Sequence, residues 1–517
     1  MIATPDLNLE VVAPIGFTAI GAMLVLLGEV LLSRRETFLG RQVTESLIGS
    51  LLGLTAIFWL ALACFVALSA FVSGTSEVFN PDNPLLRLDP FSALISALIA
   101  LSALLACWLA IAYLAELRIN HGEFYALVML AASGMMLMVA AVDLITVFLG
   151  LELMSIPIYV LAGFDRRKLR SNESSLKYFL IGSFASAILL YGMALLYGAS
   201  GSTSLEALRA GFTMESPLAL MGLGLLLVGF AFKISAVPFH QWTPDVYEGA
   251  PAVVTAFMAV SVKAAAFATL LRILALGIGP LDVTIINVLW VLAALTMVVG
   301  NVMALIQENI KRLLAYSSIG HAGYLLIGLV AATPASYSAV VFYLIAYTFT
   351  NLGAFGVIVA LAQRGQDCEK LEDLAGLARA RPGLAALMAL FMISLIGIPG
   401  TAGFFAKFYI FMAAVDAGFI SLTLIGVLTS AISVYYYLRI PVLMYMRDPR
   451  EVAPRADLAS GEAIVLVVCA VGVLLLGIFP NNSVLPVLDW ARESVGLFFT
   501  PGAVPDSVAS LGASPLP

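Results

Sequence analysis

The sequence has few charged residues and few histidines. Only 11% of its 517 residues are Asp, Glu, Lys or Arg, three are His, and 62% are hydrophobic. A soluble domain has about 25% charged residues, so this chain cannot cover a globular surface with wettable side chains. Its net charge of −6 also gives no reason to expect a nucleic-acid partner. These shortages exclude a soluble globular domain and leave a membrane protein.

Cysteine and cofactor motifs are equally scarce. The four cysteines, Cys64, Cys107, Cys368 and Cys469, stand singly, and we interpret them as small buried hydrophobes. The sequence contains no GxGxxG after a strand, no GxxxxGKS or GxxxxGKT, and no iron–sulfur cysteine spacing. We therefore expect no cofactor or metal bound by this chain, and any energy source in partner proteins. The first ten residues contain two acids and no cation, the reverse of a cleavable signal peptide.

Long apolar runs recur from Val11 almost to Pro480. Each run is long enough to cross about 30 Å of hydrocarbon as a helix. Lipid cannot satisfy backbone polar groups, and the runs lack the alternation of a membrane β-barrel. The sequence therefore predicts an all-α polytopic membrane protein with about 14 transmembrane helices. The expected spans are 11–32, 44–73, 91–115, 124–142, 144–164, 176–199, 216–237, 251–273, 283–306, 313–331, 337–362, 383–413, 419–441 and 462–480.

Lysine and arginine are distributed unequally between alternate loops. If the loop after the first span is cytoplasmic, 17 of them fall on that side, and five more lie within spans. The other side has only four, namely Arg87, Arg209, Arg272 and Arg492. Cytoplasmic loops of membrane proteins carry such an excess. The distribution predicts a multi-pass protein of the bacterial inner (cell) membrane with both termini on the extracytoplasmic side.

Two expected spans, the seventh and the twelfth, contain sequences that should break a helix. They are Lys233–Pro238 and Gly397–Gly400, and proline removes a helix hydrogen bond. The two spans are five positions apart, an odd offset that reverses direction through the membrane, so we expect two inverted five-helix repeats. Two independent proline kinks are the alternative. The predicted division is peripheral helices in 1–120, a first repeat in 121–277, a second in 278–445, and a last helix with an extracytoplasmic tail in 446–517.

Several ionisable side chains lie deep inside the expected spans. A charged side chain at a helix centre costs about 2.5–3.5 kcal/mol on insertion scales. Burial disfavours the charged form of lysine and glutamate, which brings both closer to proton exchange, and histidine titrates near neutral pH without help. The candidate residues for a proton relay are Glu152, Lys233, Lys263, His321 and Lys407. The alternative is that they form static ion pairs that hold the bundle together.

Glu152 is the expected switch of this relay. Ser155 and Tyr159 follow it at i+3 and i+7, so the three side chains share a face that should point into the bundle. Approach or separation of Glu152 and Lys233 would change proton affinity at the next lysine.

Other charged residues in or near the spans have local explanations. Lys177 lies four residues after Glu173, which makes the two an i,i+4 pair. Arg439 lies near the cytoplasmic end of its span, from which its side chain can reach the interface. Asp143 marks the start of a span. We expect static roles for these residues.

Five segments carry specific sequence motifs: Phe148–Ser155, Leu176–Phe179, Phe232–Pro251, Asn309–His321 and Gly397–Lys407. These segments closely resemble the subunit N family of respiratory complex I, which belongs to the antiporter-like membrane subunits of NADH–quinone oxidoreductases. The resemblance covers nearly the whole chain, and the block Phe232–Pro251 is highly specific.

This resemblance implies fourteen spans, two inverted five-helix repeats, and a proton channel of Glu and Lys on the broken helices. Glu152, Lys233, Lys263 and Lys407 fall on the family's functional positions, and His321 falls on the connecting path. The resemblance further implies that partner subunits carry flavin and iron–sulfur clusters, oxidise NADH and reduce quinone. The neighbouring membrane subunits K and M would be the direct contacts.

Two alternatives remain open from the sequence. The chain could be a subunit of a multi-subunit cation/proton antiporter, or a purely structural subunit of the membrane arm. The lysine in span twelve and the lack of a long C-terminal lateral helix favour subunit N over other antiporter-like subunits. The Phe232–Pro251 block favours complex I over a free antiporter. Co-purification with NADH-oxidising flavin and iron–sulfur proteins would separate the two.

Overall fold

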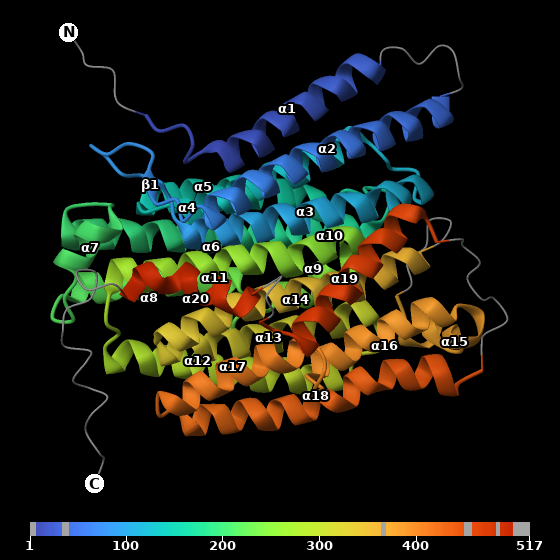
Figure 1. Ribbon diagram of the computed structural model, residues 1–517. Helices are drawn as coiled ribbons and strands as arrows, with labels where there is room; N and C mark the ends of the chain where they lie inside the picture. The colour runs from blue at the N-terminus through green and yellow to red at the C-terminus, as the bar shows by residue number, and fades with distance from the viewer. Residues whose placement is uncertain (1–6, 34–40, 363–368, 449–457, 482–485, 500–517) are drawn as a thin grey trace.

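A computed structural model describes residues 7–33, 41–362, 369–448, 458–481 and 486–499 (Figure 1). Within these residues the chain is almost entirely helical, and its one sheet is the antiparallel pair of β1 (Glu77–Val78) and β2 (Arg87–Leu88). The helices are α1 (Ala13–Ser33), α2 (Arg41–Val72), α3 (Pro90–Glu116), α4 (Gly122–Ala140), α5 (Leu144–Ala162), α6 (Leu169–Ser200), α7 (Leu205–Gly211), α8 (Pro217–Lys233), α9 (Trp242–Gly249), α10 (Ala252–Phe257), η1 (Met258–Val262), α11 (Lys263–Arg272), η2 (Ile273–Ile278), α12 (Val283–Leu305), α13 (Ile310–Ala331), α14 (Pro334–Leu361), η3 (Leu371–Leu374), α15 (Leu377–Ala380), α16 (Pro382–Ile396), α17 (Ala402–Asp416), α18 (Ile420–Met446), α19 (Ser460–Ile478), α20 (Val487–Val495) and η4 (Gly496–Phe499).

Twelve helical segments of the described chain are long and apolar enough to cross a membrane. Two shorter apolar helices, α8 and α16, are the first halves of interrupted helices. Most segments begin and end within a few residues of the expected spans, although α6 begins seven residues earlier. The all-α, multi-pass membrane fold predicted from the sequence is confirmed, and the count of fourteen spans stays a prediction.

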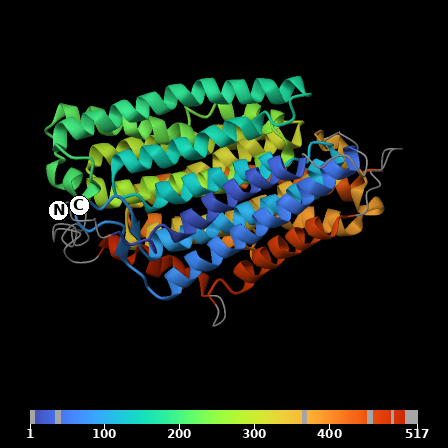
Figure 2. The ribbon, with the colours of Figure 1, turned by 90° about the horizontal axis from the view of Figure 1, so that it is seen from above.

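The axes of the long helices are roughly aligned, so the bundle has two ends (Figures 1 and 2). The sheet and α7 lie at the end where α1 starts, and α15 lies at the opposite end. The continuous run Ala252–Ile278 and helix α13 are buried along their length, whereas α1 is mostly exposed. Side chains on the central helices therefore cannot reach lipid, and a charged one must find its partners inside the bundle.

The first predicted helix break is confirmed between α8 and α9. Helix α8 ends at Lys233, and Ser235 then adopts a left-handed backbone with φ 62°, which a continuing helix does not allow. The chain resumes as α9 at Trp242, whose indole N–H donates to the carbonyl oxygen of Phe232 at 3.0 Å. The carbonyl at the end of α8 thus gains a partner although the helix has stopped.

The second predicted break is confirmed between α16 and α17. Gly397 and Gly400 both have φ 90°, a conformation that glycine adopts at no steric cost. Gly403 lies so close to α16 that an added Cβ would stand 1.8 Å from the carbonyl oxygen of Ser394. Glycine at these three positions therefore allows the chain to leave one helix and to start the next beside it.

Two cations that the charge count places in loops lie inside helices instead: Arg272, one of the four on the extracytoplasmic side, and Lys311, one of the 17 on the cytoplasmic side. Arg272 lies in α11 with no exposed surface, and its guanidinium pairs with Asp89, the N-cap of α3, at 2.7 Å. Lys311 is buried near the start of α13 and donates to the carbonyl oxygen of Ala250 at 2.9 Å. From the sequence, a cation near the end of an apolar run is taken to mark the end of the span. In the structure, the helix continues beyond Arg272 as η2, and α13 already begins before Lys311. The charge asymmetry between the loops remains large without them.

The cysteine interpretation holds for the described residues. Cys107 and Cys469 are buried, and Cys64 is half-buried. Cys368 lies outside the described residues.

Candidate functional site

Lys233 ends α8 inside the bundle, where it is almost fully buried. Its ammonium nitrogen donates to Ser155 Oγ at 2.7 Å and lies 3.4 Å from Tyr159 OH. Both hydroxyls belong to α5, so the predicted interior face of that helix is confirmed. The nitrogen also lies 5.8 Å from the ring centroid of Tyr178 on α6. Three helices therefore enclose this lysine.

Glu152 lies one turn before Ser155 on α5 and is half-buried. Its carboxylate interacts electrostatically with Lys233, but it forms no ion pair with a described residue. Its Oε1 atom is buried and has no hydrogen-bond partner among the described residues. The lysine thus uses two hydroxyls, and not the carboxylate, as its hydrogen-bond partners.

Lys263 stands where the π-helical turn η1 passes into α11. Its nitrogen donates to both the carbonyl oxygen and the hydroxyl of Ser318 on α13. The same nitrogen lies 5.3 Å from the ring centroid of Tyr347 on α14. π-helical turns occur frequently at functional sites because they displace side chains from regular helix positions. All contacts of this buried cation are to uncharged groups.

His321 is held by tyrosine hydroxyls from two other helices. Its Nδ1 lies 2.5 Å from Tyr343 OH on α14, and its Nε2 lies 3.0 Å from Tyr437 OH on α18. Tyr437 also hydrogen-bonds Ser317, one turn earlier on α13. A hydroxyl can donate or accept, so this chain of groups accommodates the imidazole in either protonation state.

Lys407 occupies the second helix break. Its nitrogen donates to the carbonyl oxygens of Leu395 and Ile396 at 3.0 and 2.8 Å. It also donates to Ser430 Oγ on α18 at 2.9 Å and lies 5.1 Å from the ring centroid of Tyr324. The carbonyls are free because α16 stops at Ile396. The break therefore provides the acceptors that this lysine uses.

The predicted site residues fall into two clusters. Both Lys263 and Lys407 interact electrostatically with His321, so these three form one buried cluster on α11, α13 and α17. Glu152 and Lys233 form the other. Aromatic contacts join the clusters: Tyr178 stacks on Trp242 at 4.4 Å, Trp242 meets Tyr247 at 6.4 Å, and the Tyr247 hydroxyl faces Ser318.

Sequence reasoning missed the hydroxyl groups that hold these cations and the imidazole. The residues concerned are Ser318, Tyr343, Ser430 and Tyr437. Ser and Tyr are common in membrane helices, and they carry no charge that would distinguish them in an apolar run. The signal that was present is the i,i+4 repeat of Tyr343, Tyr347 and Asn351, which places polar groups on one face of α14.

The predicted ion pair of Lys177 and Glu173 is confirmed, and further ion pairs lie beside it. Lys177 pairs with Glu173 at 2.7 Å and also with Asp245 on α9 at 3.2 Å. Arg312 of α13 pairs with Asp245 at 2.7 Å and with Glu248 at 3.0 Å. These ion pairs connect α9 to α6 and α13. Separately, Asp143 caps α5 through the backbone N–H groups of its first turn.

Comparison with known proteins identifies the family. The family model for the NADH:quinone oxidoreductase/Mrp antiporter transmembrane region matches residues 141–433. NADH-quinone oxidoreductase subunit N of Trichlorobacter lovleyi is 46% identical over 444 residues, which cover 85% of this chain and 90% of that protein. The chain belongs to the subunit N family of NADH-quinone oxidoreductases. Subunit N of Myxococcus xanthus is 39% identical and covers 96% of this chain and 99% of its own length.

Two solved structures share the fold of this chain. A chain of respiratory complex I from Thermus thermophilus, solved with bound aureothin, is 37% identical with a TM-score of 0.76, over 90% of this chain and 97% of that one. A chain of the Mrp complex from a Dietzia species has a TM-score of 0.82 but only 23% identity, over 95% of this chain and 98% of that one. This second likeness shows a shared fold alone.

Proposed function

We propose that this subunit N family member moves protons across the membrane as part of an NADH–quinone oxidoreductase. NADH oxidation and quinone reduction take place in partner subunits, which carry the flavin and iron–sulfur clusters. The membrane subunits K and M are its proposed neighbours. The observation that carries the proposal is the cluster of Lys263, His321 and Lys407, buried in the central helices and held by uncharged partners.

The cluster has the chemistry that proton transfer needs. A buried lysine without a carboxylate partner pays for its charge with desolvation, so its charged and neutral forms come closer in free energy. His321 interacts electrostatically with both lysines and can pass a proton by accepting at one ring nitrogen and donating from the other. A static ion pair would require an opposite charge, and the contacts of these three residues with the described part of the chain include none.

Glu152 is the proposed switch at the other cluster. Its carboxylate favours the charged form of Lys233, and a movement of α5 or α8 would alter that influence. The broken helix gives Lys233 a position at a helix end, where the backbone is less constrained than in a helix interior. A change at Lys233 would then reach Lys263 through the α9 segment that separates them.

The proposed topology puts the α15 end of the bundle in the cytoplasm of a bacterial cell and both termini outside it. The excess of Lys and Arg in loops at that end supports this orientation. A cysteine placed at Ser202 should react with a membrane-impermeant reagent only from the extracytoplasmic side. Reaction from the cytoplasmic side would reverse the orientation.

Lys263 offers the sharpest test of proton transfer. Lys263→Met keeps much of the side-chain length but cannot hold a proton, and Lys263→Arg keeps the charge but cannot release one. Both should lower the protons translocated per NADH oxidised, with normal amounts of assembled complex. Lys177→Met, at a partly exposed ion pair, is the matched control and should pump like the wild type.

Two outcomes would contradict the proposal. If Lys263→Arg pumps normally, only the positive charge matters and no proton leaves this lysine. If every Lys263 variant fails to assemble while the control assembles, the lysine is structural. The antiporter alternative is tested by purification of the native complex, because recovery without NADH-oxidising flavin and iron–sulfur partners would favour it.

A further inference from the structure

Helix α14 carries a polar stripe past the central cluster. Tyr343, Tyr347 and Asn351 lie four residues apart, on one face of the helix. Tyr343 bonds His321, and the ring of Tyr347 lies 5.3 Å from the Lys263 nitrogen. Asn351 lies one further turn towards the α15 end of the bundle. The stripe therefore starts at the histidine, passes the lysine and continues beyond it.

The far part of this stripe has polar atoms without protein partners. Both the Nδ2 and the Oδ1 of Asn351 are buried and make no hydrogen bond with any described residue, and the residue has no exposed surface. The Tyr347 hydroxyl faces Ser318 but also completes no hydrogen bond within the described chain. A buried polar group left unsatisfied costs about 1–3 kcal/mol. In folded proteins such groups are nearly always bonded to protein or to ordered water.

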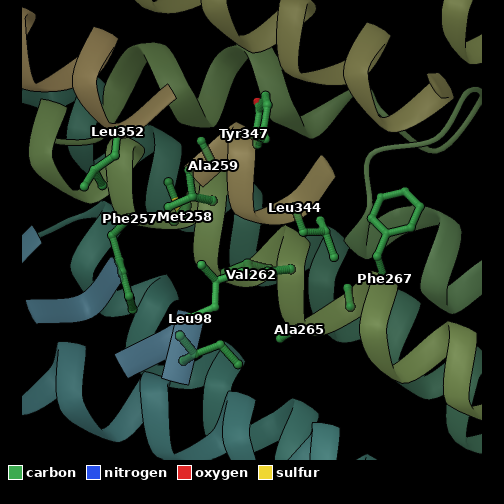
Figure 3. Packing of buried hydrophobic residues seen from close by; sticks show 14 of the residues in the cluster. Leu98, Phe257, Met258, Ala259, Val262, Ala265, Phe267, Leu344, Tyr347 and Leu352 are labelled. Carbon is green, nitrogen blue, oxygen red and sulfur yellow. The ribbon is translucent and has the colours of Figure 1, made fainter. Parts of the chain in front are cut away.

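The surroundings place these atoms between Lys263 and the proposed cytoplasmic end. Phe355, one turn beyond Asn351, contacts the ring of Tyr247 on α9 at 6.5 Å. Helix α9 also carries Glu248, which lines a cavity of about 160 Å³ at the bundle end. The ring of Tyr347 lies 5.0 Å from the ring of His321, and Figure 3 shows Met258 and Ala259 close to Tyr347. The unpartnered atoms of Asn351 thus continue the polar stripe of α14 towards that end.

We propose that Asn351 and the Tyr347 hydroxyl bind water that delivers protons from the cytoplasmic end to Lys263. This inference rests on the proposed function. The amide both donates to water and accepts from it, and so orients the water without exchanging a proton itself. A hydrated proton, H₃O⁺, gives one proton to the neutral Lys263 amine. An O–H bond breaks, an N–H bond forms with the nitrogen lone pair, and water and an ammonium group result.

Asn351→Leu tests the site, because leucine has nearly the shape of asparagine and no polar atoms. The complex should assemble normally, and the protons translocated per NADH oxidised should fall severalfold. Tyr347→Phe, which removes only the hydroxyl, should cause a smaller fall. Tyr337→Phe on the same helix is its control, because that ring packs against Phe499 away from the cluster, and pumping should not change.

The outcomes separate this inference from the proposed function. If Lys263→Met abolishes pumping while Asn351→Leu and Tyr347→Phe pump like the wild type, only the water site is rejected. If Lys263→Met itself pumps normally, the proposed function fails first. If the complex with Asn351→Leu does not assemble, the test is proton pumping by Tyr347→Phe, and normal pumping in that variant overturns the inference. Asn301→Leu on α12 is expected to impair assembly, because Asn301 has partners in Met297, Tyr324 and Tyr436.

Discussion

The two broken helices present their lysines to different chemical groups. Lys233 precedes the first break and contacts two hydroxyls of a neighbouring helix, with Glu152 near by. Lys407 follows the second break and contacts two backbone carbonyls that the break itself leaves free, together with Ser430. The second break thus supplies backbone ligands to its own lysine, whereas the lysine at the first break is bound by side chains of a neighbouring helix.

This difference bears on the protonation state that each site favours. A carbonyl oxygen can only accept a hydrogen bond, so the Lys407 site is built for an ammonium group, which donates three. A hydroxyl can donate to a neutral amine or accept from an ammonium, so the Lys233 site tolerates both states. Two of the contacts of Lys407 can therefore only accept, whereas both hydroxyls beside Lys233 can also donate.

The largest expected effect comes from Lys407. Lys407→Met leaves the Leu395 and Ile396 carbonyls without their donor and removes the proton carrier. Lys407→Arg keeps a donor but does not deprotonate. Since a proton-transferring side chain typically contributes about 10²–10⁴-fold, transfer through this subunit should fall by about 10²-fold or more in both variants. Protons translocated per NADH oxidised measure it, and normal pumping by the arginine variant would reduce Lys407 to a fixed charge.

A smaller effect is expected from the backbone of the second break. Gly403→Ala would place a Cβ 1.8 Å from the Ser394 carbonyl oxygen, and such overpacking costs about 1–3 kcal/mol. The midpoint of thermal unfolding of the purified complex, or the yield of assembled complex, should fall. Gly383→Ala is the matched control on α16, where an added Cβ meets no atom within 4 Å. Equal stability of the two variants would show that α17 can move away from α16 at no cost.

The smallest expected effect is at Glu152. Glu152→Gln removes the charge and keeps the shape, so Lys233 loses the negative charge near by, and pumping should fall by less than in the Lys407 variants. Glu152→Asp keeps the charge and should do less harm. The comparison is made at equal amounts of assembled complex. If both variants pump like the wild type, the first break differs from the second in structure but carries no switch.

The sequence by itself determined that the chain is an all-α membrane protein and where both helices break. Hydropathy depends on composition within one segment, and helix interruption depends on local Pro and Gly, so neither needs knowledge of distant residues. The five site residues could be selected for the same reason, because an ionisable residue stands out in an apolar run. The inverted repeats and the domain division are predicted from the same local features, namely the apolar runs and the positions of Pro and Gly.

Only the tertiary structure decided which groups these residues meet. Ser318 is 55 residues from Lys263, and Tyr437 is 116 residues from His321, so no local pattern pairs them. The same holds for Arg272, which looks like a loop residue until Asp89, 183 residues away, is placed beside it. A cation in a membrane must be matched by whichever groups the packed helices bring to it. Those partners are therefore set by helix packing and not by neighbours in the sequence.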